Sequence, residues 1–535
     1  MREVLSVCCA KLQARVLAKS AFLVFCAILF LSLAPPSNAQ STGGRIRGTV
    51  TDNSGASVAG AKVILINQGT NAVREAQSGA SGEYLFLEVA VGTYEVDVTI
   101  AGFKKYVRKG IPLNLDEIVG VDIALQVGGA TETVEVSGAP AVIDTTTTQL
   151  GAVMTEKSVT ELPLSTRNTY ELLQLQPGVQ SQLGADLFYG SDNPGVVSVN
   201  GGRGRSNNYM VNGGDGNDLF VNGPAIQPSP DAISEFRVLT NTFDAEYGRN
   251  SGSVVNVVTK SGTNEVHGDF YEFIRNDVLN TKGFFDSTVP DYKQNQFGAT
   301  IGGPIKKDKT FIFGSYEGNR LRQGISSGQV FLPSAAEASG DFGAGGGFPI
   351  LSTPPPAGGY APGTLGVLSD QTFATELASR TTGGGQTCQQ AVTAEGGVAI
   401  QPGAAYSQIF PNSVVPTACF DPTALALYNR YVAPFGTDVF TGSPVESDRS
   451  DQFTVRFDHA ISPTQQFSVY YYFNDDAQDQ PFSNFQGAGA DLPGFGALFK
   501  TRVQQWNISH TWTLGSSAVN EFRFSYFREG QHDLN

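Results

Sequence analysis

The sequence predicts a mostly β protein, and two observations lead to that prediction. Four segments between Asp451 and Arg528 place an apolar, mainly aromatic residue at alternate positions, with polar residues between them. These apolar positions are Phe453, Val455 and Phe457; Phe467, Val469, Tyr471 and Phe473; Trp506, Ile508, Trp512 and Leu514; and Phe522, Phe524 and Tyr526. Such alternation is typical of strands with one apolar face and one polar face. The second observation is an N-terminal export signal.

Residues 1–39 have the three parts of a secretory signal peptide. The basic part contains Arg2, Lys11, Arg15 and Lys19, and the apolar core from 21 to 33 is too short to span a bilayer. Small residues end the segment at Ala39, after which we expect cleavage. In an exported chain the aromatic alternation fits membrane strands of about ten residues. It also fits a soluble β-sandwich, which the strands alone favour.

The charge of the chain excludes one class of partner. The 535 residues carry a formal net charge of −15, and removal of the leader, with four basic residues against Glu3, makes it −18. A chain this acidic, without a basic cluster, argues against nucleic-acid binding. After the leader no stretch approaches the roughly 18 apolar residues of a membrane helix, so a membrane-spanning mature protein would have to be a closed barrel.

Residues 43–127 predict a small exported β-domain. Alternating apolar residues at 94–100 and 119–125, a buried-type run at 63–66 and turn signals at 52–55, 81–82 and 101–102 favour a seven-stranded sandwich of about 85 residues. The segment resembles the carboxypeptidase regulatory-like domain. The matching stretches are 48–52, 54–56, 60–63, 82–86, 92–94 and 102–103. That domain is the non-catalytic appendage of the peptidases, and no His pattern here would hold zinc. We expect no catalytic residue, metal or cofactor.

Residues 128–262 predict a mixed α/β unit with glycine-rich loops. We expect a short extended segment at 131–137, a helix at 168–175 capped by Ser165 or Thr166, and strands at 195–202, 208–213 and 235–240. The run from Gly201 to Gly213 resembles the plug domain of TonB-dependent outer-membrane transporters. Four further stretches, at 233–238, 245–249, 252–262 and 264–277, make the chain similar to the Oar-like members, which carry a carboxypeptidase-like domain before the plug.

This resemblance implies a fold and favours the barrel over the soluble sandwich. The implied order is the N-terminal β-sandwich at 43–127, a small α/β plug domain at 128–262 and an incomplete antiparallel transmembrane β-barrel at 263–535. We expect barrel strands at 265–275, 294–301 and 310–317, followed by the four aromatic segments, with a long extracellular loop at 319–450. Plugged transporter barrels have about 22 strands. The sequence contains only about seven such strands, so we expect it to be an N-terminal fragment of a longer protein.

The resemblance also implies a function. It indicates an outer-membrane receptor that moves an unidentified extracellular ligand, with outer-membrane lipid around it and the TonB-ExbB-ExbD complex as energy source. The expected TonB contact adds as a strand by β-augmentation. Its residues are Thr131, Glu132, Thr133, Val134, Glu135, Val136 and Ser137. A simple linker strand remains the other interpretation of this segment. The sequence does not separate import from export of a partner.

Two alternatives stay open at this point. The chain could instead be a cell-surface adhesion or carbohydrate-binding β-protein without transport activity, with the sandwich as its binding module.

Two cysteines remain after the leader, Cys388 and Cys419, which lie 31 positions apart in a region rich in Gly and Pro. In an exported protein we expect them to form a disulfide, and two free thiols are the alternative.

Overall fold

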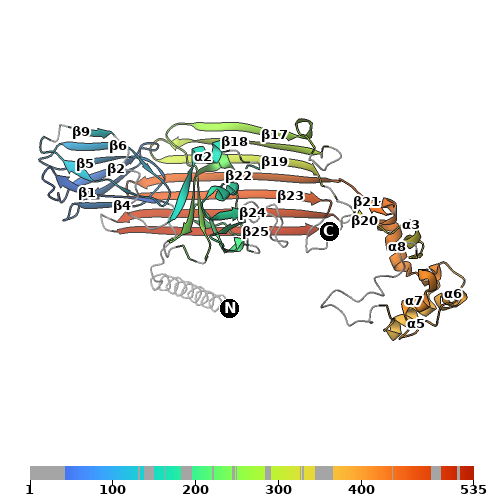
Figure 1. The fold of residues 1–535 in the computed structure, drawn as a ribbon. Coiled ribbons are helices and arrows are strands. Elements are labelled where there is room, and N and C mark those ends of the chain that lie inside the picture. Colours follow the sequence, from blue (N-terminus) through green and yellow to red (C-terminus); the bar gives the residue numbers. More distant parts are fainter. Residues whose placement is uncertain are drawn as a thin grey trace, which may run out of the picture.

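The structure of the protein, a computed structural model, describes most of the chain after the leader. The described residues are 43–129, 133–137, 150–181, 196–282, 289–343, 366–482 and 496–534, without 163, 165, 220–221, 244–246, 249, 290, 326, 328–329, 437 and 515–517. A long curved sheet, which we call the wall, carries a sandwich at one end and a helical subdomain at the other (Figure 1). Between them an inner domain lies against one face of the wall. Of the helices described, none combines the length and apolar character that a membrane-spanning helix requires.

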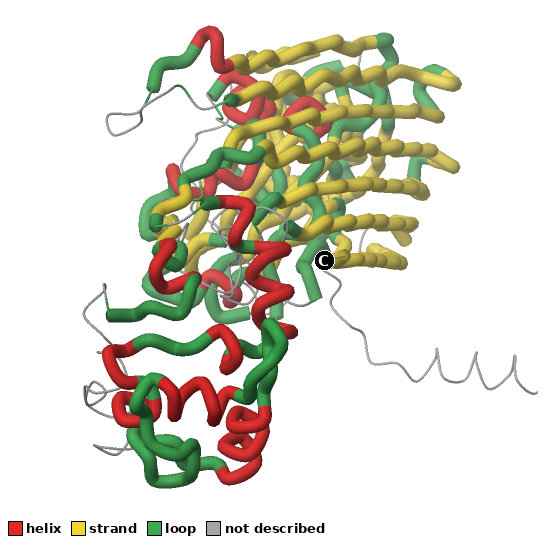
Figure 2. Tube along the Cα trace, turned by 90° about the vertical axis from the view of Figure 1, so that its right-hand side faces the viewer, coloured by secondary structure: helices red, strands yellow, loops and turns green. Residues whose placement is uncertain are grey.

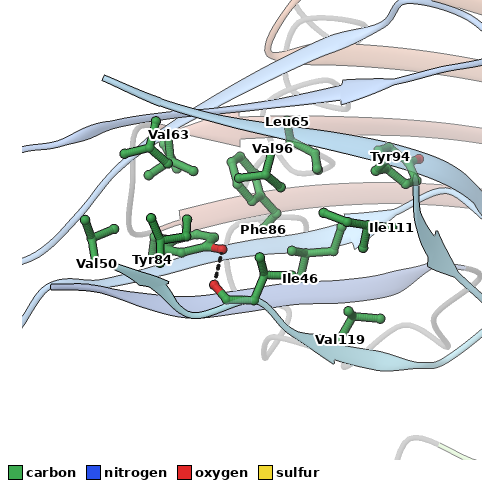
Figure 3. Close-up of a cluster of buried hydrophobic side chains, with 14 of the residues drawn as sticks. Ile46, Val50, Val63, Leu65, Tyr84, Phe86, Tyr94, Val96, Ile111 and Val119 are labelled. Atoms are coloured by element: carbon green, nitrogen blue, oxygen red, sulfur yellow. Dashed lines mark hydrogen bonds between the residues drawn. The ribbon is translucent and has the colours of Figure 1, made fainter. Parts of the chain in front are cut away.

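The sandwich consists of two sheets. One contains β4 (Glu83–Val89), β1 (Gly44–Asp52), β7 (Ile118–Gly120) and β8 (Ile123–Leu125). The other has the order β3 (Val73–Gln77), β2 (Lys62–Asn67), β5 (Gly92–Thr99), β6 (Lys105–Leu113) and β9 (Thr133–Ser137). The alternation of the sequence turns Ile46, Val63, Phe86 and Val96 inward (Figure 3), where all four are at most 2% exposed. Tyr84 is buried with them, and its hydroxyl donates to the carbonyl of Val121 over 2.6 Å.

The predicted count of seven strands in the sandwich is wrong. β7 and β8 pair in parallel with successive halves of β1, so one predicted strand is split in two. β9 adds to the second sheet from beyond the predicted boundary at residue 127. Its pairing is a long-range contact that alternation within one segment does not reveal.

The inner domain is built on a five-stranded sheet. The sheet has the order β10 (Leu150–Thr155), β15 (Ile233–Asn241), β16 (Val254–Thr259), β13 (Asn208–Val211) and β14 (Gly214–Asp215). The other elements are α2 (Glu156–Glu161), η1 (Thr169–Leu175), the paired β11 (Val179–Ser181) and β12 (Val197–Val199), η2 (Gly204–Ser206) and η3 (Pro230–Ala232). The predicted helix at 168–175 is a 3-10 helix, and its cap is Asn168 rather than Thr166, because the Asn168 side chain accepts from the Tyr170 amide. Position 165 lies outside the described residues.

The wall contains the seven predicted strands in sequence order, each antiparallel to the next. Figure 2 shows them side by side in one sheet. They are β17 (His267–Asn276), β18 (Tyr292–Lys306), β19 (Thr310–Gly324), β22 (Val445–Ser462), β23 (Gln465–Gln480), β24 (Ala497–Leu514) and β25 (Ala518–Leu534). The 3-10 turn η4 (Asp277–Leu279) follows β17. The mostly β fold is confirmed, and the sheet is open, because no described strand joins β17 to β25.

The two faces of the wall differ as the alternation predicts. Phe522, Phe524 and Trp506 are between 43% and 56% exposed on the outer face, and Phe270 is 91% exposed. Gln505, which neighbours Trp506 in the same strand, is fully buried on the inner face. The strand period of two therefore turns Trp506 outward and its neighbour Gln505 toward the inner domain.

The connection from β19 to β22 holds a helical subdomain. A two-stranded neck of β20 (Val330–Phe331) and β21 (Val439–Phe440) leads to it, next to α3 (Ala335–Ala338). Its helices are α5 (Gln371–Ser379), α6 (Cys388–Ala394), α7 (Tyr406–Ile409) and α8 (Pro422–Tyr431), with the 3-10 turns η5 (Pro411–Ser413), η6 (Thr417–Cys419) and η7 (Ala433–Phe435). We call residues 366–435 the loop subdomain. It has a hydrophobic core of its own, which includes Leu368, Val392 and Ile409.

Candidate functional site: the contacts of the inner domain

The inner domain shares a hydrophobic core with the wall. Tyr170, Tyr209 and Phe236 of the inner domain belong to one buried cluster with Tyr470 and Tyr472 of β23 and Val503 of β24. The Tyr170 ring is nearly perpendicular to the rings of Tyr209 and Phe236, with centroid distances of 5.5 Å and 6.3 Å. Burial of several aromatic side chains stabilises this contact strongly, because each one removes a large apolar area from water.

Polar side chains of the wall bind backbone carbonyls of the inner domain. Asn507 donates to the Val211 carbonyl over 2.9 Å, and Gln505 donates to the Asp215 carbonyl over 2.8 Å. Arg456 donates to the Thr259 carbonyl over 2.8 Å. A neutral hydrogen bond contributes about 1 kcal/mol net, and one from a charged donor such as Arg456 about 1.5–3 kcal/mol. These bonds position the inner domain but can be broken one at a time.

Arg167 makes the most concentrated contact between the inner domain and the wall. Its guanidinium lies 4.6 Å from the ring centre of Tyr271 and 4.1 Å from that of Phe273, both in β17. It pairs with Asp231 of the inner domain and lies 3.7 Å from Glu317 of β19. The Tyr271 hydroxyl donates to the same Glu317 carboxylate over 2.8 Å. One cation therefore connects two carboxylates and two rings in a site where its side chain is only 11% exposed.

The sandwich is attached to the inner domain by the turn that follows β6. Leu115 in this turn is fully buried, and its amide donates to Glu235 Oε2 of β15 over 2.7 Å. The Leu115 carbonyl accepts from Arg237 Nη1 over 2.5 Å. Burial raises the pKa of Glu235 to about 7, although the Leu115 amide and the Arg237 charge act in the other direction. Burial also raises the pKa of the neighbouring Asp116.

The sandwich also contacts the ends of the wall strands. Arg74 donates to Thr513 Oγ1 over 3.0 Å, Asn71 donates to Asp308 Oδ1 over 3.0 Å, and Arg523 lies 3.7 Å from Glu88. A cavity of about 530 Å³ lies where the sandwich, the inner domain and the wall meet. Charged and polar side chains line much of it, and they include Lys260, Arg456, Asp458, Glu521 and Arg523.

The segment expected to contact TonB is partly described. Thr131 and Glu132 lie outside the described residues, and Thr133, Val134, Glu135, Val136 and Ser137 form β9. β9 runs parallel to β6, with Thr133 opposite Lys105 and Ser137 opposite Lys109. Lys109 Nζ lies 3.1 Å from Glu135 Oε1. The segment is therefore an edge strand of the sandwich in this structure.

The two cysteines lie in the loop subdomain. Cys388 begins α6 and Cys419 ends η6, their Cα atoms are 4.6 Å apart, and the structure joins them by a disulfide. Both residues are at most 3% exposed and belong to the subdomain core. The cysteines therefore connect two helical segments of a packed unit rather than two points of an irregular loop.

Sequence reasoning missed Arg167, Glu235 and Arg237. A signal was present for the last two, because they alternate with Ser234, Phe236 and Val238 in a strand pattern and so share one face. Their partner, the turn at Leu115, is about 120 positions earlier, and nothing local indicates it. Among the residues that the structure describes, no group of His, Cys, Asp and Glu could hold a metal ion.

Comparison with protein families gives two matches. Residues 258–535 match the outer membrane beta barrel domain, and residues 45–126 match the carboxypeptidase regulatory-like domain. The TonB-dependent transporter Oar of Myxococcus xanthus is 30% identical over 326 residues, which are 56% of this chain and 29% of Oar. The chain thus spans less than a third of the length of that relative.

Comparison with solved structures gives more distant similarities. The outer membrane transporter YddB from Escherichia coli has a TM-score of 0.40 and 11% identity, over 70% of this chain and 38% of YddB. The siderophore receptor PirA from Pseudomonas aeruginosa has a TM-score of 0.36 and 10% identity, over 72% of this chain and 41% of PirA.

Proposed function

The chain belongs to the outer-membrane β-barrel family and resembles the Oar-like TonB-dependent transporters, and from this premise we propose that it moves a ligand across the outer membrane by an energy-coupled rearrangement of its inner domain. In this proposal the inner domain is the plug and the seven strands are part of the barrel around it. The function is transport rather than catalysis.

One observation supports this proposal most directly. The outer face of the wall exposes aromatic residues such as Phe270, Phe522 and Phe524, and the inner face holds the inner domain by hydrogen bonds to its backbone. An apolar outer face suits hydrocarbon, whereas a soluble sandwich would bury that face against a second sheet. The contacts on the inner face suit a plug that is held in place and then displaced.

The connections of the wall favour one orientation in the membrane. At the sandwich end β18 ends at Lys306 and β19 begins at Thr310, and β22 ends at Ser462 where β23 begins at Gln465. At the opposite end the connections run over residues 277–291, 325–444 and 481–496. Outer-membrane barrels keep their short turns in the periplasm. The sandwich then lies in the periplasm, and the loop subdomain lies outside the cell.

Energy coupling in this proposal starts at the segment 131–137. A strand of TonB, driven by ExbB and ExbD, adds to this segment by β-augmentation and pulls on the inner domain. Release requires the wall's bonds to the Val211, Asp215 and Thr259 carbonyls to break, together with the Arg167 contacts. Because most of these are single, modest bonds, a directed pull can break them in sequence.

Two experiments test the proposal. The whole protein should fractionate with outer membranes and migrate in a heat-modifiable way on gels, whereas release by salt alone would contradict a membrane barrel. The C-terminal domain of TonB should capture the protein in a pull-down. Val134→Pro should abolish capture, because proline removes a backbone donor, and the control Val134→Thr should keep it. Equal capture of both variants would refute the assignment of this segment.

A further inference from the structure

The outer edge of β9 is a hydrogen-bonding surface with which no described strand pairs. β9 stands last in the sheet order β3-β2-β5-β6-β9, and within the part of the chain that the structure describes it pairs with β6 alone. In a strand, alternate residues direct their N–H and C=O groups to opposite sides. One side of β9 is therefore occupied by β6, and the other presents its backbone groups to a further strand.

The remaining edge fits a partner of defined chemistry. A row of backbone donors and acceptors with the spacing of a strand is satisfied by another strand and by few other ligands. Glu135 is about half exposed on this strand and pairs with Lys109, so the backbone edge rather than a local excess of charge defines the partner. Resting on the proposed function, we propose that the energy-transducing partner adds its strand to the outer edge of β9 while β9 stays paired with β6.

This arrangement gives a physical path for force. Partner, β9 and β6 would form one continuous sheet, and β6 ends at Leu113, just before the turn that holds Leu115. Leu115 is bonded through its amide to Glu235 and through its carbonyl to Arg237, both in β15. A pull on β9 thus reaches the inner domain through the sandwich as well as along the chain. Because β9 and β6 are parallel, a pull along the strand axis loads all their bonds together.

The competing possibility is that β9 must leave the sandwich before it binds the partner. The ladder is only five residues long, from Lys105–Thr133 to Lys109–Ser137. The described side chains support it with a surface ion pair between Lys109 and Glu135, of which both members are about half exposed. Such a pair adds little stability. The strand could therefore detach, and the experiment has to separate the two modes of binding.

A disulfide between β9 and β6 separates them. Val107 and Glu135 are register partners in the parallel pair, so Val107→Cys with Glu135→Cys can lock β9 in place. The probe is the purified C-terminal domain of TonB, and the readout is its Kd for the whole protein in detergent. Each double-mutant sample is measured oxidised and after reduction, so that the substitutions themselves cancel. The single variants, with and without reductant, are the matched controls.

The outcomes are distinct. If the inference is right, the oxidised and reduced forms bind with Kd values within threefold, and partner binding slows amide exchange in β9 without exposing β6. A loss of threefold or more on oxidation, restored by reductant, would overturn the inference while leaving the TonB contact itself intact. Absence of binding by the reduced double mutant and by the wild-type protein would instead refute the proposed function.

Discussion

The contact between the sandwich and the inner domain should weaken as the pH rises. Burial raises the pKa of Glu235 to about 7 from an ordinary value of 4.5, so the attached state favours the neutral carboxyl. The attachment is then strongest below pH 4.5, is lost progressively up to about pH 7 and changes little above it. A pKa difference of one corresponds to about 1.36 kcal/mol. The upper limit of the effect is therefore about 3 kcal/mol, or roughly two orders of magnitude in the attachment equilibrium.

Hydrogen exchange of the Leu115 amide measures this equilibrium, because that amide donates to Glu235. Exchange times at pH 5.5 and pH 8.0 must first be corrected for the chemical exchange rate. We expect weaker protection at pH 8.0 in the wild-type protein and a much smaller pH effect in Glu235→Gln. The pH effect that persists in Glu235→Gln is expected to come from Asp116, whose pKa is also raised by burial. Glu83→Gln, at an exposed position of β4, is the control. Equal protection at both pH values, or the same pH effect in Glu235→Gln, would refute the reasoning.

Three further perturbations have defined outcomes. Arg167→Lys should weaken the contact of the inner domain with the wall by about 1–2 kcal/mol, because an ammonium group cannot pair with two carboxylates and stack on two rings together. Faster amide exchange in η1 would report this loss, with Arg203→Lys at an exposed position as the control. Unchanged exchange would contradict the role given to Arg167. Alkylation without reductant should label neither Cys388 nor Cys419, and labelling of both thiols in the native protein would end the disulfide prediction. Replacing both by Ser should lower the stability of the loop subdomain by about 3–4 kcal/mol for a loop of this length. We expect the resulting proteolysis to be confined to residues 366–435. Tyr84→Phe should destabilise the sandwich by about 1–2 kcal/mol, because the Val121 carbonyl loses a buried donor. Denaturant unfolding of the sandwich measures this loss, and an unchanged unfolding midpoint would contradict the prediction.

The wall was predictable from sequence because its strands carry their own signal. Phe453 to Phe457 and Phe522 to Tyr526 alternate strictly, since one face is apolar and the other polar. The ends of the strands were not predictable: β22 starts at Val445 and β23 continues to Gln480, through polar residues without alternation. There the extended conformation comes from pairing with neighbouring strands, which a single segment does not encode.

The loop subdomain and the attachment of the sandwich show two different limits. The helices α5 to α8 are short, and packing rather than length stabilises them. Their starts carried local signals all the same, because Asp370, Thr387 and Asp421 each cap a helix, and Thr387 forms a capping box with Gln390. The pairing of β9 with β6 and the bonds of Leu115 to β15 carry no local signal. They depend on how separately folded parts meet, and alternation and turn residues do not record that.

The register of β19 and β22 has a consequence for how the wall tolerates change. The two strands pair from Thr310–His459 to Gly324–Val445, so the long segment between them leaves and re-enters the sheet at adjacent points. The entropic cost of closing a loop rises only slowly with its length. The neck of β20 and β21 fixes the two ends of the inserted segment. We therefore expect the connection between β19 and β22 to tolerate large changes. The inserted segment can be exchanged, enlarged or shortened to a tight hairpin without altering the two strands.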